Sequence, residues 1–360
     1  MQIIILNFLL FGVPLIFLPL EFPIFELPKV IVSQVLIEFL LLIYIFRQNQ
    51  LSNPRSQVFL KVILFIFVVS LVHLVLFNTP ITFFGNQFRL QGVFLLWNLL
   101  AFSFLSSSIN IGRDTDKIAS ISIVLLAIGA IFLGSPQTRR AFGTLGEPNA
   151  LAATVVFLWP FLYFSPKRFL KILGPLIAFL IILISGSRSG MVAYFMQLIF
   201  LLLRQYFKLS LSQVIIICFL FLTFSYTFPF FEQRVFENRF EVWQTAVAAG
   251  LKNPLLGGGF GNGEYLLHQT AVSLKNNIQY QYVDSSHNLF LDWWIQAGII
   301  GLGLLIFLIA KTLQNLIINQ RFLEITILLG ILTVLSFNPA SVVSLIALWW
   351  LIGQGAARLS

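Results

Sequence analysis

Long continuous runs of apolar residues recur along the whole chain, separated by short polar links. Apolar and polar positions do not alternate, as they would in a membrane β-barrel, and most runs approach the roughly 20 residues that a helix needs to cross a bilayer. The pattern predicts an all-α, polytopic membrane bundle of about twelve spans, forming one integral-membrane domain over residues 1–360. The predicted spans are residues 2–20, 30–46, 59–77, 92–111, 118–134, 150–164, 172–185, 191–203, 212–228, 288–310, 322–336 and 342–355.

Composition agrees with this pattern, because 58% of the residues are hydrophobic and only 10% are charged. Soluble domains carry roughly a quarter charged residues, so most of this chain does not face water. The first apolar run has no basic residues before it and no small-residue cleavage site, and we interpret it as a retained span rather than a signal peptide. The single cysteine, Cys218, excludes an intrachain disulfide.

The distribution of basic residues predicts the orientation. When the N-terminus is placed in the cytoplasm, the inside loops hold more Lys and Arg than the short outside loops. We therefore expect a membrane protein with both termini in the cytoplasm. Residues 229–287 form by far the longest link, a predicted extracytoplasmic loop of functional importance. The net charge of +9 is scattered rather than gathered in a stripe, so no nucleic-acid partner is expected.

Arg188 is the first candidate for binding an anion. It lies in SGSRSG, a tight turn between two predicted spans on the outside, where the positive-inside rule disfavours a cation. The neighbouring Gly186 and Gly190 would allow a ligand to approach the backbone closely. The alternative is an arginine that anchors a helix end at the membrane surface.

Arg139 and Arg140 are a second basic pair, followed by a Gly-rich turn and a helix that is predicted to start near Pro148 or Asn149. They either assist in anion binding or belong to an ordinary interfacial loop.

The long loop supplies a third basic group. Residues 231–251 are predicted to form an amphipathic helix along the membrane surface, ending before Asn253 and Pro254. Arg239 has no acidic residue three or four positions away and is the stronger candidate, whereas Arg234 is weaker because it can pair within the helix. The following GGGFGNG does not match a nucleotide-binding motif, and we interpret it as a flexible loop whose N–H groups could touch phosphate.

Two histidines of the long loop are candidates for acid–base chemistry. His287 lies where the chain re-enters the membrane as a helix, with Asp284, Ser285 or Ser286 placed to cap that helix. A neutral imidazole at this boundary could accept a proton from a sugar hydroxyl, although a lone histidine is more often structural. His268 is a weaker candidate from the same loop.

Glu38 falls near the middle of the second predicted span, where an ionisable group is by default a candidate for function. It is the best single argument for transport. The sequence contains no HExxH or CxxC spacing and no close pair of outside acids, so we expect neither a metal nor another cofactor.

Four segments together resemble the O-antigen ligase and polymerase superfamily: GTLGEPNALAATVVFLWPF, GSRSGM, RFEVWQTAVAAGLKNPLLGGGFGNG and SSHNLFLDWWIQAGIIGLGL. The resemblance covers roughly residues 135–305 and implies a helical bundle with a large periplasmic loop over an outward-facing cavity. It also implies transfer of a glycan from undecaprenyl diphosphate to a glycolipid, another glycan or a protein, without a metal. Arg188 and Arg239 are similar to the arginines of the family that grip the diphosphate, and His287 is similar to its loop-end histidine.

Three functions follow as hypotheses. The first is ligase-like, inverting glycan transfer from a polyprenyl diphosphate carrier at the outer face of the membrane, with Arg139 or Arg140 assisting. The second is an O-antigen or exopolysaccharide polymerase, which would use the same donor. The third is an anion transporter of the bicarbonate type, using Glu38 and the outward arginines.

Overall fold

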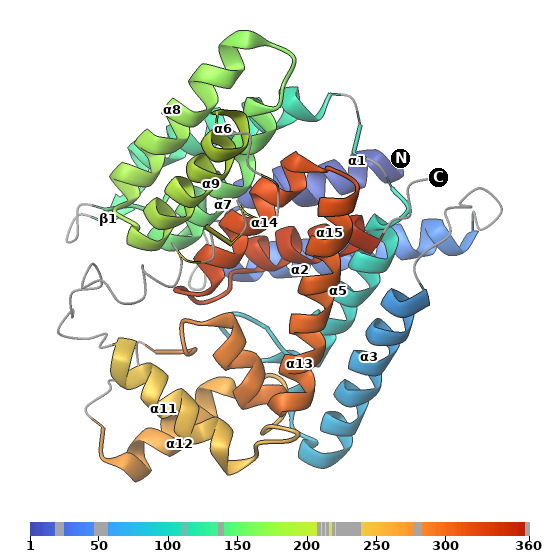
Figure 1. Ribbon diagram of the computed structural model, residues 1–360. Helices are drawn as coiled ribbons and strands as arrows, with labels where there is room; N and C mark the ends of the chain where they lie inside the picture. Colours follow the sequence, from blue (N-terminus) through green and yellow to red (C-terminus); the bar gives the residue numbers. More distant parts are fainter. Residues whose placement is uncertain are drawn as a thin grey trace.

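The computed structural model describes residues 1–18, 25–46, 57–109, 111–112, 114–135, 140–206, 210, 213, 216–217, 220, 239–276 and 283–356. The described chain is an almost entirely helical bundle with one two-residue antiparallel hairpin (Figure 1). The elements in order are α1 (Gln2–Asn7), η1 (Phe8–Gly12), η2 (Val13–Leu15), α2 (Glu26–Phe46), α3 (Gln57–Phe77), α4 (Pro80–Phe84), α5 (Val93–Ser106), α6 (Thr115–Phe132), β1 (Gly134–Ser135), β2 (Arg140–Ala141), η4 (Gly143–Leu145), α7 (Pro148–Tyr163), α8 (Arg168–Ser185), α9 (Arg188–Tyr206), α11 (Arg239–Lys252), α12 (Gly263–Leu274), α13 (Leu289–Ile318), α14 (Phe322–Leu335) and α15 (Val342–Ala356).

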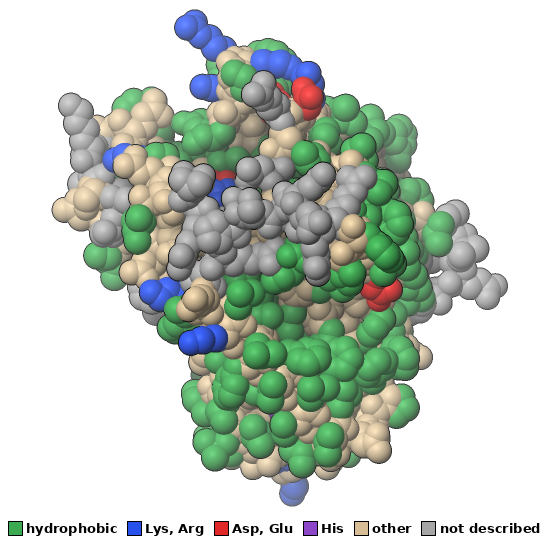
Figure 2. Space-filling model, turned by 90° about the vertical axis from the view of Figure 1, so that its right-hand side faces the viewer, with side chains coloured by type: hydrophobic (Ala, Val, Ile, Leu, Met, Phe, Trp, Pro, Cys, Tyr) green, Lys and Arg blue, Asp and Glu red, His purple; other side chains and the backbone are tan. Residues whose placement is uncertain are grey.

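The helices confirm an all-α membrane protein. Helices α2, α3, α6, α8 and α13 are long and apolar enough to cross a membrane, and shorter apolar helices pack between them. Their exposed faces carry large hydrophobic side chains, and Figure 2 shows a broad hydrophobic surface with charged groups near its margins. The number of twelve spans stays a prediction. Most of the predicted span at 212–228 lies outside the described residues.

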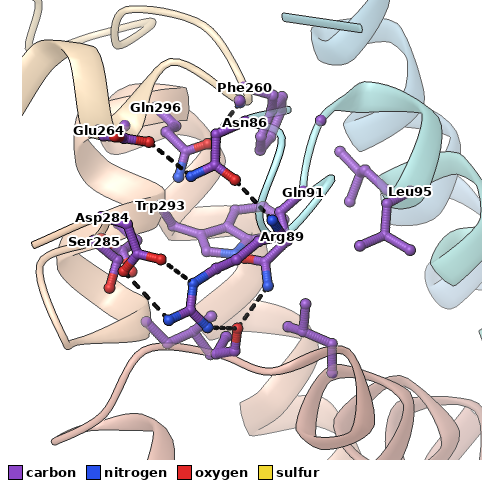
Figure 3. A pocket seen from close by; sticks show the side chains of 18 of the residues that line it. Asn86, Arg89, Gln91, Leu95, Phe260, Glu264, Asp284, Ser285, Trp293 and Gln296 are labelled. Atoms are coloured by element: carbon purple, nitrogen blue, oxygen red, sulfur yellow. Dashed lines mark hydrogen bonds and ion pairs between the residues drawn. The ribbon is translucent and has the colours of Figure 1, made fainter. Parts of the chain in front are cut away.

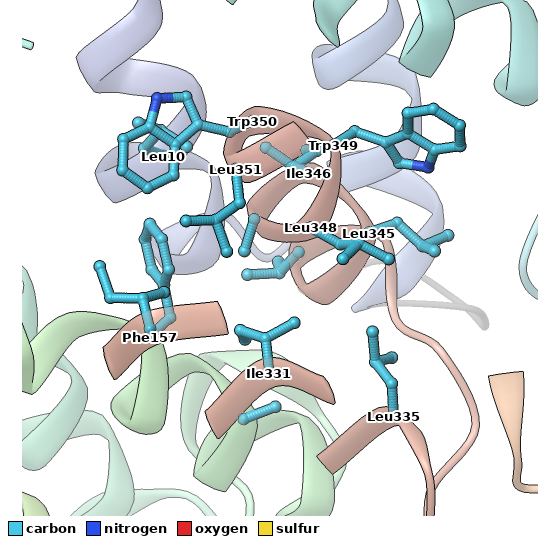
Figure 4. Close-up of a cluster of buried hydrophobic side chains, with 14 of the residues drawn as sticks. Leu10, Phe157, Ile331, Leu335, Leu345, Ile346, Leu348, Trp349, Trp350 and Leu351 are labelled. Carbon is cyan, nitrogen blue, oxygen red and sulfur yellow. The ribbon is translucent and has the colours of Figure 1, made fainter. Parts of the chain in front are cut away.

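The centre of the bundle is formed by α15 and α7. Every residue of α15 is buried, which explains why this helix is apolar on all faces. Figure 4 shows Trp349 and Trp350 pointing to opposite sides of α15, with Phe157 of α7 and Ile331 of α14 beneath it. Because the tightly packed core is continuous from α7 to α15, it fixes the relative positions of the loops at the ends of these helices.

Lys29 fixes the start of α7. The span predicted at residues 30–46 starts just after this residue, but the structure includes it in the first turns of α2, with no exposed surface. Its ammonium donates to the carbonyl oxygen of Thr144 at 2.8 Å and to that of Phe25 at 2.7 Å. The hydroxyl of Thr144 in turn donates to the carbonyl oxygen of Pro14 at 2.8 Å. The turn before α7 is therefore tied to two other segments by buried hydrogen bonds.

Helix α13 is broken at Gly298, whose φ of 63° and ψ of −169° are almost restricted to glycine. The break frees backbone groups, and residues 254–259 satisfy them. Ile299 N–H donates to the Pro254 carbonyl oxygen at 2.8 Å, and Gly258 N–H donates to the Ile295 carbonyl oxygen at 2.9 Å. A Cβ atom at Gly298 would lie 2.2 Å from the Leu255 oxygen, so the close approach itself excludes a side chain.

The two loop helices, α11 and α12, gather beside the first part of α13 at one end of the bundle (Figure 1). We call this end, which also carries residues 134–135, 140–147, 185–188 and 336–341, the loop end. The predicted amphipathic helix at 231–251 corresponds to α11 from Arg239 onward, and it ends before Asn253 as expected. Residues 231–238 lie outside the described residues.

Candidate functional site

The link between α14 and α15, residues 336–341, is the centre of the loop end. The oxygen of the Asn338 side chain accepts a hydrogen bond from an Arg239 guanidinium nitrogen at 3.4 Å. The amide nitrogen of Asn338 donates to the Ser189 hydroxyl. Asn338 is 2% exposed. One buried side chain therefore joins the first residue of α11 to the first turn of α9, although these positions are far apart in the sequence.

Arg140 joins the same region from β2. Its Nε donates to the Ser185 carbonyl oxygen at 2.8 Å, and a terminal nitrogen lies 3.5 Å from the Asn149 side-chain oxygen. Ser187 donates to that oxygen at 2.9 Å and lies 3.2 Å from the Ser189 hydroxyl. We call the connected set the arginine network: Arg140, Asn149, Ser187, Ser189, Asn338 and Arg239.

Arg188 is the first residue of α9, between two serines of the arginine network, and its side chain is exposed. The neighbouring glycines have a different role from the one predicted. Gly186 ends α8 in the left-handed conformation, with φ of 60°. A Cβ atom at Gly190 would lie 2.5 Å from the Ala152 methyl group. The two glycines therefore serve the helix end and the packing of α9 on α7.

His287 lies in a tight segment that leads into α13 and is 6% exposed. Its φ of 57° is left-handed, a region that histidine enters more readily than most residues. The predicted caps at Asp284, Ser285 or Ser286 are wrong. Asn288 is the cap, and its side-chain oxygen accepts from the N–H groups of Phe290 at 2.9 Å and Leu291 at 3.2 Å.

The His287 segment contacts the same central link as the arginine network. The amide of Asn288 donates to the Ser336 carbonyl oxygen at 3.1 Å. On the other side, Ser286 N–H donates to the Asp292 carboxylate at 2.8 Å. These bonds hold the imidazole-bearing residue between α13 and the 336–341 link.

A pocket opens on the other side of this segment, with an empty volume of about 860 Å³ including its mouth. It lies between the α4–α5 link, α12 and the first turns of α13 (Figure 3). We call it the carboxylate pocket and define it by Asn86, Arg89, Phe260, Glu264, Asp284, Asp292, Trp293, Gln296 and Trp349.

Arg89 is the central cation of the carboxylate pocket, and it lies in no motif that would mark this role. Its guanidinium forms an ion pair with Asp284, and a terminal nitrogen lies 3.9 Å from the Glu147 carboxylate. Another terminal nitrogen donates to the Ala340 carbonyl oxygen at 3.3 Å. Burial alone would lower the pKa of the Arg89 guanidinium, but the nearby carboxylates of Asp284 and Glu147 raise that pKa above its usual range.

The glycine-rich segment after α11 is ordered by hydrogen bonds rather than left as a flexible loop. Gly258, Gly259 and Gly261 donate their N–H groups to acceptors in α13. Since these three N–H groups already have protein acceptors, the structure gives no phosphate cradle there. The segment instead holds the broken helix.

The remaining candidates lie elsewhere. His268 is on the exposed face of α12, in an open depression whose rim includes Asn86 and Glu264. Glu38 is exposed on the outer face of α2 among apolar side chains, so it does not line a path inside the bundle. Arg139 and Arg234 lie outside the described residues.

Within the described parts of the chain, no three His, Cys, Asp or Glu side chains gather as a possible metal site.

Two comparisons with known proteins bear on this site. Residues 150–306 match the family model described as O-antigen ligase, which confirms the resemblance drawn from the sequence segments. The matched region includes Arg188, Arg239, His268 and His287 but not Arg140 or Arg89.

The chain is also similar to a ComP-specific O-oligosaccharyltransferase of Acinetobacter baylyi (strain ATCC 33305 / BD413 / ADP1). The two are 24% identical over 291 residues, which cover 68% of this chain and 52% of the relative. This chain thus spans about half the length of the curated relative that it matches.

Proposed function

We propose that this chain, which matches the O-antigen ligase family model over residues 150–306, transfers a glycan from a polyprenyl diphosphate carrier, of the undecaprenyl type, to an acceptor. The transfer takes place at the outer face of the bacterial inner membrane. Its donor is a lipid-linked glycan, and its acceptor is a glycolipid, another glycan or a protein.

One observation carries the proposal. Residues 336–341 bind Arg239 and Ser189 through Asn338, and they bind the His287 segment through Ser336 and Asn288. Three segments that are distant in sequence therefore meet at one end of the bundle. These segments carry guanidinium groups and an imidazole, which suit a substrate that carries a diphosphate and reacts with a hydroxyl group.

The arginines would hold the diphosphate. Arg188 is exposed at the start of α9, and the Asn338 side-chain oxygen orients the Arg239 guanidinium by accepting a hydrogen bond from it. One guanidinium group can bind two phosphate oxygens at once, and it stays charged at any physiological pH. Arg140 assists from β2, where bonds to Ser185 and Asn149 fix its plane. Arg139 is a further candidate from the adjoining residues.

The reaction needs no metal in this scheme. The acceptor hydroxyl oxygen forms a bond to the anomeric carbon while the bond between that carbon and the phosphate oxygen breaks. The bonding electron pair leaves with the polyprenyl diphosphate, whose added negative charge the arginines stabilise. The hydroxyl proton passes to the imidazole of His287. Because the hydroxyl attacks from the face opposite the leaving group, the anomeric configuration inverts.

The orientation is part of the proposal. Residues 229–287, including α11 and α12, form one extracytoplasmic loop of a single membrane domain, and both termini lie in the cytoplasm. Cysteine labelling tests it: Cys218 is replaced by Ser, and a single Cys is introduced at exposed Lys275. A membrane-impermeant maleimide should label Lys275→Cys in intact spheroplasts. Labelling only after lysis would contradict the orientation.

Activity is tested in proteoliposomes that contain the full chain and lipid-linked oligosaccharide isolated from a strain lacking the gene. We expect glycan transfer in the presence of EDTA, with inversion of the anomeric signal in the NMR spectrum of the product. In the deletion strain, accumulated single repeats indicate a lost polymerase and full-length chains a lost ligase. Unchanged lipid-linked pools together with altered bicarbonate uptake would refute glycan transfer and favour the transporter.

A further inference from the structure

The carboxylate pocket differs in charge from the arginine network. Glu264, Asp284 and Asp292 line it, against one cation, Arg89. The guanidinium of Arg89 is committed to Asp284 and to the Ala340 carbonyl oxygen. An excess of carboxylates repels an anion such as a diphosphate, so this pocket suits an uncharged ligand.

Fixed polar groups form one wall of the pocket. The Asn86 amide nitrogen donates to the Glu264 carboxylate at 2.7 Å. The Asn86 side-chain oxygen accepts from the backbone N–H of Arg89 at 2.8 Å. The Gln296 side-chain oxygen accepts from Gly261 N–H at 2.8 Å. Carboxylate and amide groups held in this way accept and donate hydrogen bonds without losing further rotational freedom when a ligand binds.

Aromatic rings also line the pocket, and we call them the ring wall. Phe260 and Trp293 meet edge to face with ring centres 5.4 Å apart, and the ring centres of Trp293 and Trp349 are 6.4 Å apart. Sugars combine hydroxyl groups on their rim with an apolar C–H face, so a lining of aromatic rings together with carboxylates and amides can contact both surfaces. Figure 3 shows Trp293 behind Arg89, with Asn86, Glu264 and Gln296 on the same side.

We infer that the carboxylate pocket binds an uncharged sugar residue of the glycan chain, in a subsite separate from the diphosphate site. This inference rests on the proposed function for the origin of the glycan. Asp284 and Ser285 line the pocket, and His287 follows within the same short segment. The pocket therefore borders the segment that carries His287. The kinetic part of the test decides whether this sugar belongs to the lipid-linked donor or to the acceptor.

The test is a binding measurement on the full chain in nanodiscs. The probes are oligosaccharides released by mild acid from the host's membrane-lipid fraction and divided by anion exchange into neutral and acidic pools. We expect the neutral pool to bind and to quench tryptophan fluorescence. Glu264→Gln keeps an oxygen that accepts from Asn86 but removes the charge, and it should weaken binding of the neutral pool about tenfold. Arg239→Ala should leave this binding unchanged.

Equal affinity of the wild type and Glu264→Gln for the neutral pool would overturn the inference, as would binding of the acidic pool alone or of neither pool. A Trp293→Leu variant provides a second check, because loss of the ring wall should also weaken the neutral pool about tenfold. Both variants must retain the wild-type melting temperature within a few degrees to count.

Polyprenyl diphosphate binding is measured separately, so the two proposals can fail independently. If the protein binds diphosphate and the pocket variants still bind sugar normally, the proposed function stands and the sugar subsite is refuted. If the protein binds sugar but no diphosphate, the sugar subsite stands and the proposed function is refuted. In the transfer assay, a raised KM of Glu264→Gln for the acceptor alone assigns the sugar to the acceptor, and a raised KM for the lipid-linked glycan alone assigns it to the donor.

Discussion

The arginine network and the carboxylate pocket lie on two sides of the same link, and both contain arginine. Asn338 of that link contacts Arg239, and Ala340 contacts Arg89. Neutral oxygens of Asn338 and Ser185 accept hydrogen bonds from Arg239 and Arg140 and orient their guanidinium groups. Arg89 instead faces two carboxylates. A carboxylate neighbour therefore commits the Arg89 guanidinium to the fold, whereas amide and carbonyl neighbours orient a guanidinium for another role.

The largest effect is expected at His287, which lies between the two regions. Asn tolerates the left-handed backbone and preserves the local fold, but its side chain cannot accept the proton. His287→Asn should reduce kcat by roughly 10²–10⁴ and leave the KM of both substrates nearly unchanged. Initial rates of glycan transfer in proteoliposomes measure this. A kcat within threefold of the wild type would remove His287 from the reaction.

Arg239→Ala tests the cationic side of the comparison and should reduce transfer by roughly 10²–10³. The charge of a lysine in the same place is less well matched to two phosphate oxygens, so Arg239→Lys should recover only part of the rate. Lys275→Asn is the control, because it removes a positive charge from the exposed end of α12 at a left-handed position that Asn tolerates. If both variants lose the same activity, general loop charge rather than Arg239 is responsible.

Asn338→Asp sharpens the contrast by giving Arg239 a carboxylate neighbour like that of Arg89. The new charge should compete with the diphosphate for the guanidinium, and the bond that Asn338 donates to Ser189 is lost. We expect the KM for the lipid-linked donor to rise about tenfold with a smaller change in kcat. Asn338→Ala, which adds no charge, should affect donor KM less. An equal rise in both variants would argue for a purely structural role.

The smallest effect on catalysis is expected at Arg89. Arg89→Ala leaves Asp284 without its countercharge in a partly buried position, so the unfolding free energy should fall by about 1–3 kcal/mol. Adding Asp284→Asn should restore part of the lost unfolding free energy, because the unpaired carboxylate charge is removed. Thermal unfolding in nanodiscs compares the single and double variants. Equal melting temperatures would show that the ion pair contributes little.

Hydrophobic runs were sufficient to locate the helices of the core. The predicted spans at 59–77 and 342–355 differ from α3 and α15 by one or two residues, because a helix in lipid must be apolar along its whole length. Hydrophobicity failed where a helix leaves lipid. The prediction ended at residue 310, but α13 continues to Ile318 through Lys311 and Thr312, and α12 was not predicted.

The site was only partly accessible from the sequence. Arg188, Arg239 and His287 stand out as cations or imidazole in short motifs, and the structure brings their segments to one end. Asn338 gives no such signal, because Asn-Pro after an apolar run is typical of an ordinary turn. The pairing of Arg89 with Asp284 joins residues 195 positions apart. A contact of that range depends on packing that no local pattern encodes.

The break at Gly298 has a consequence for how the protein responds to its lipid environment. It divides α13 into a short first part and an apolar stretch of about 20 residues, which is roughly 30 Å long and matches the hydrocarbon thickness. Residues 254–259 are bonded to both sides of the break and therefore join the two parts of α13 to the loop helices. A thicker or thinner bilayer that tilts the second part should therefore also shift the loop helices, so the position of the imidazole relative to the residues around it should respond to bilayer thickness.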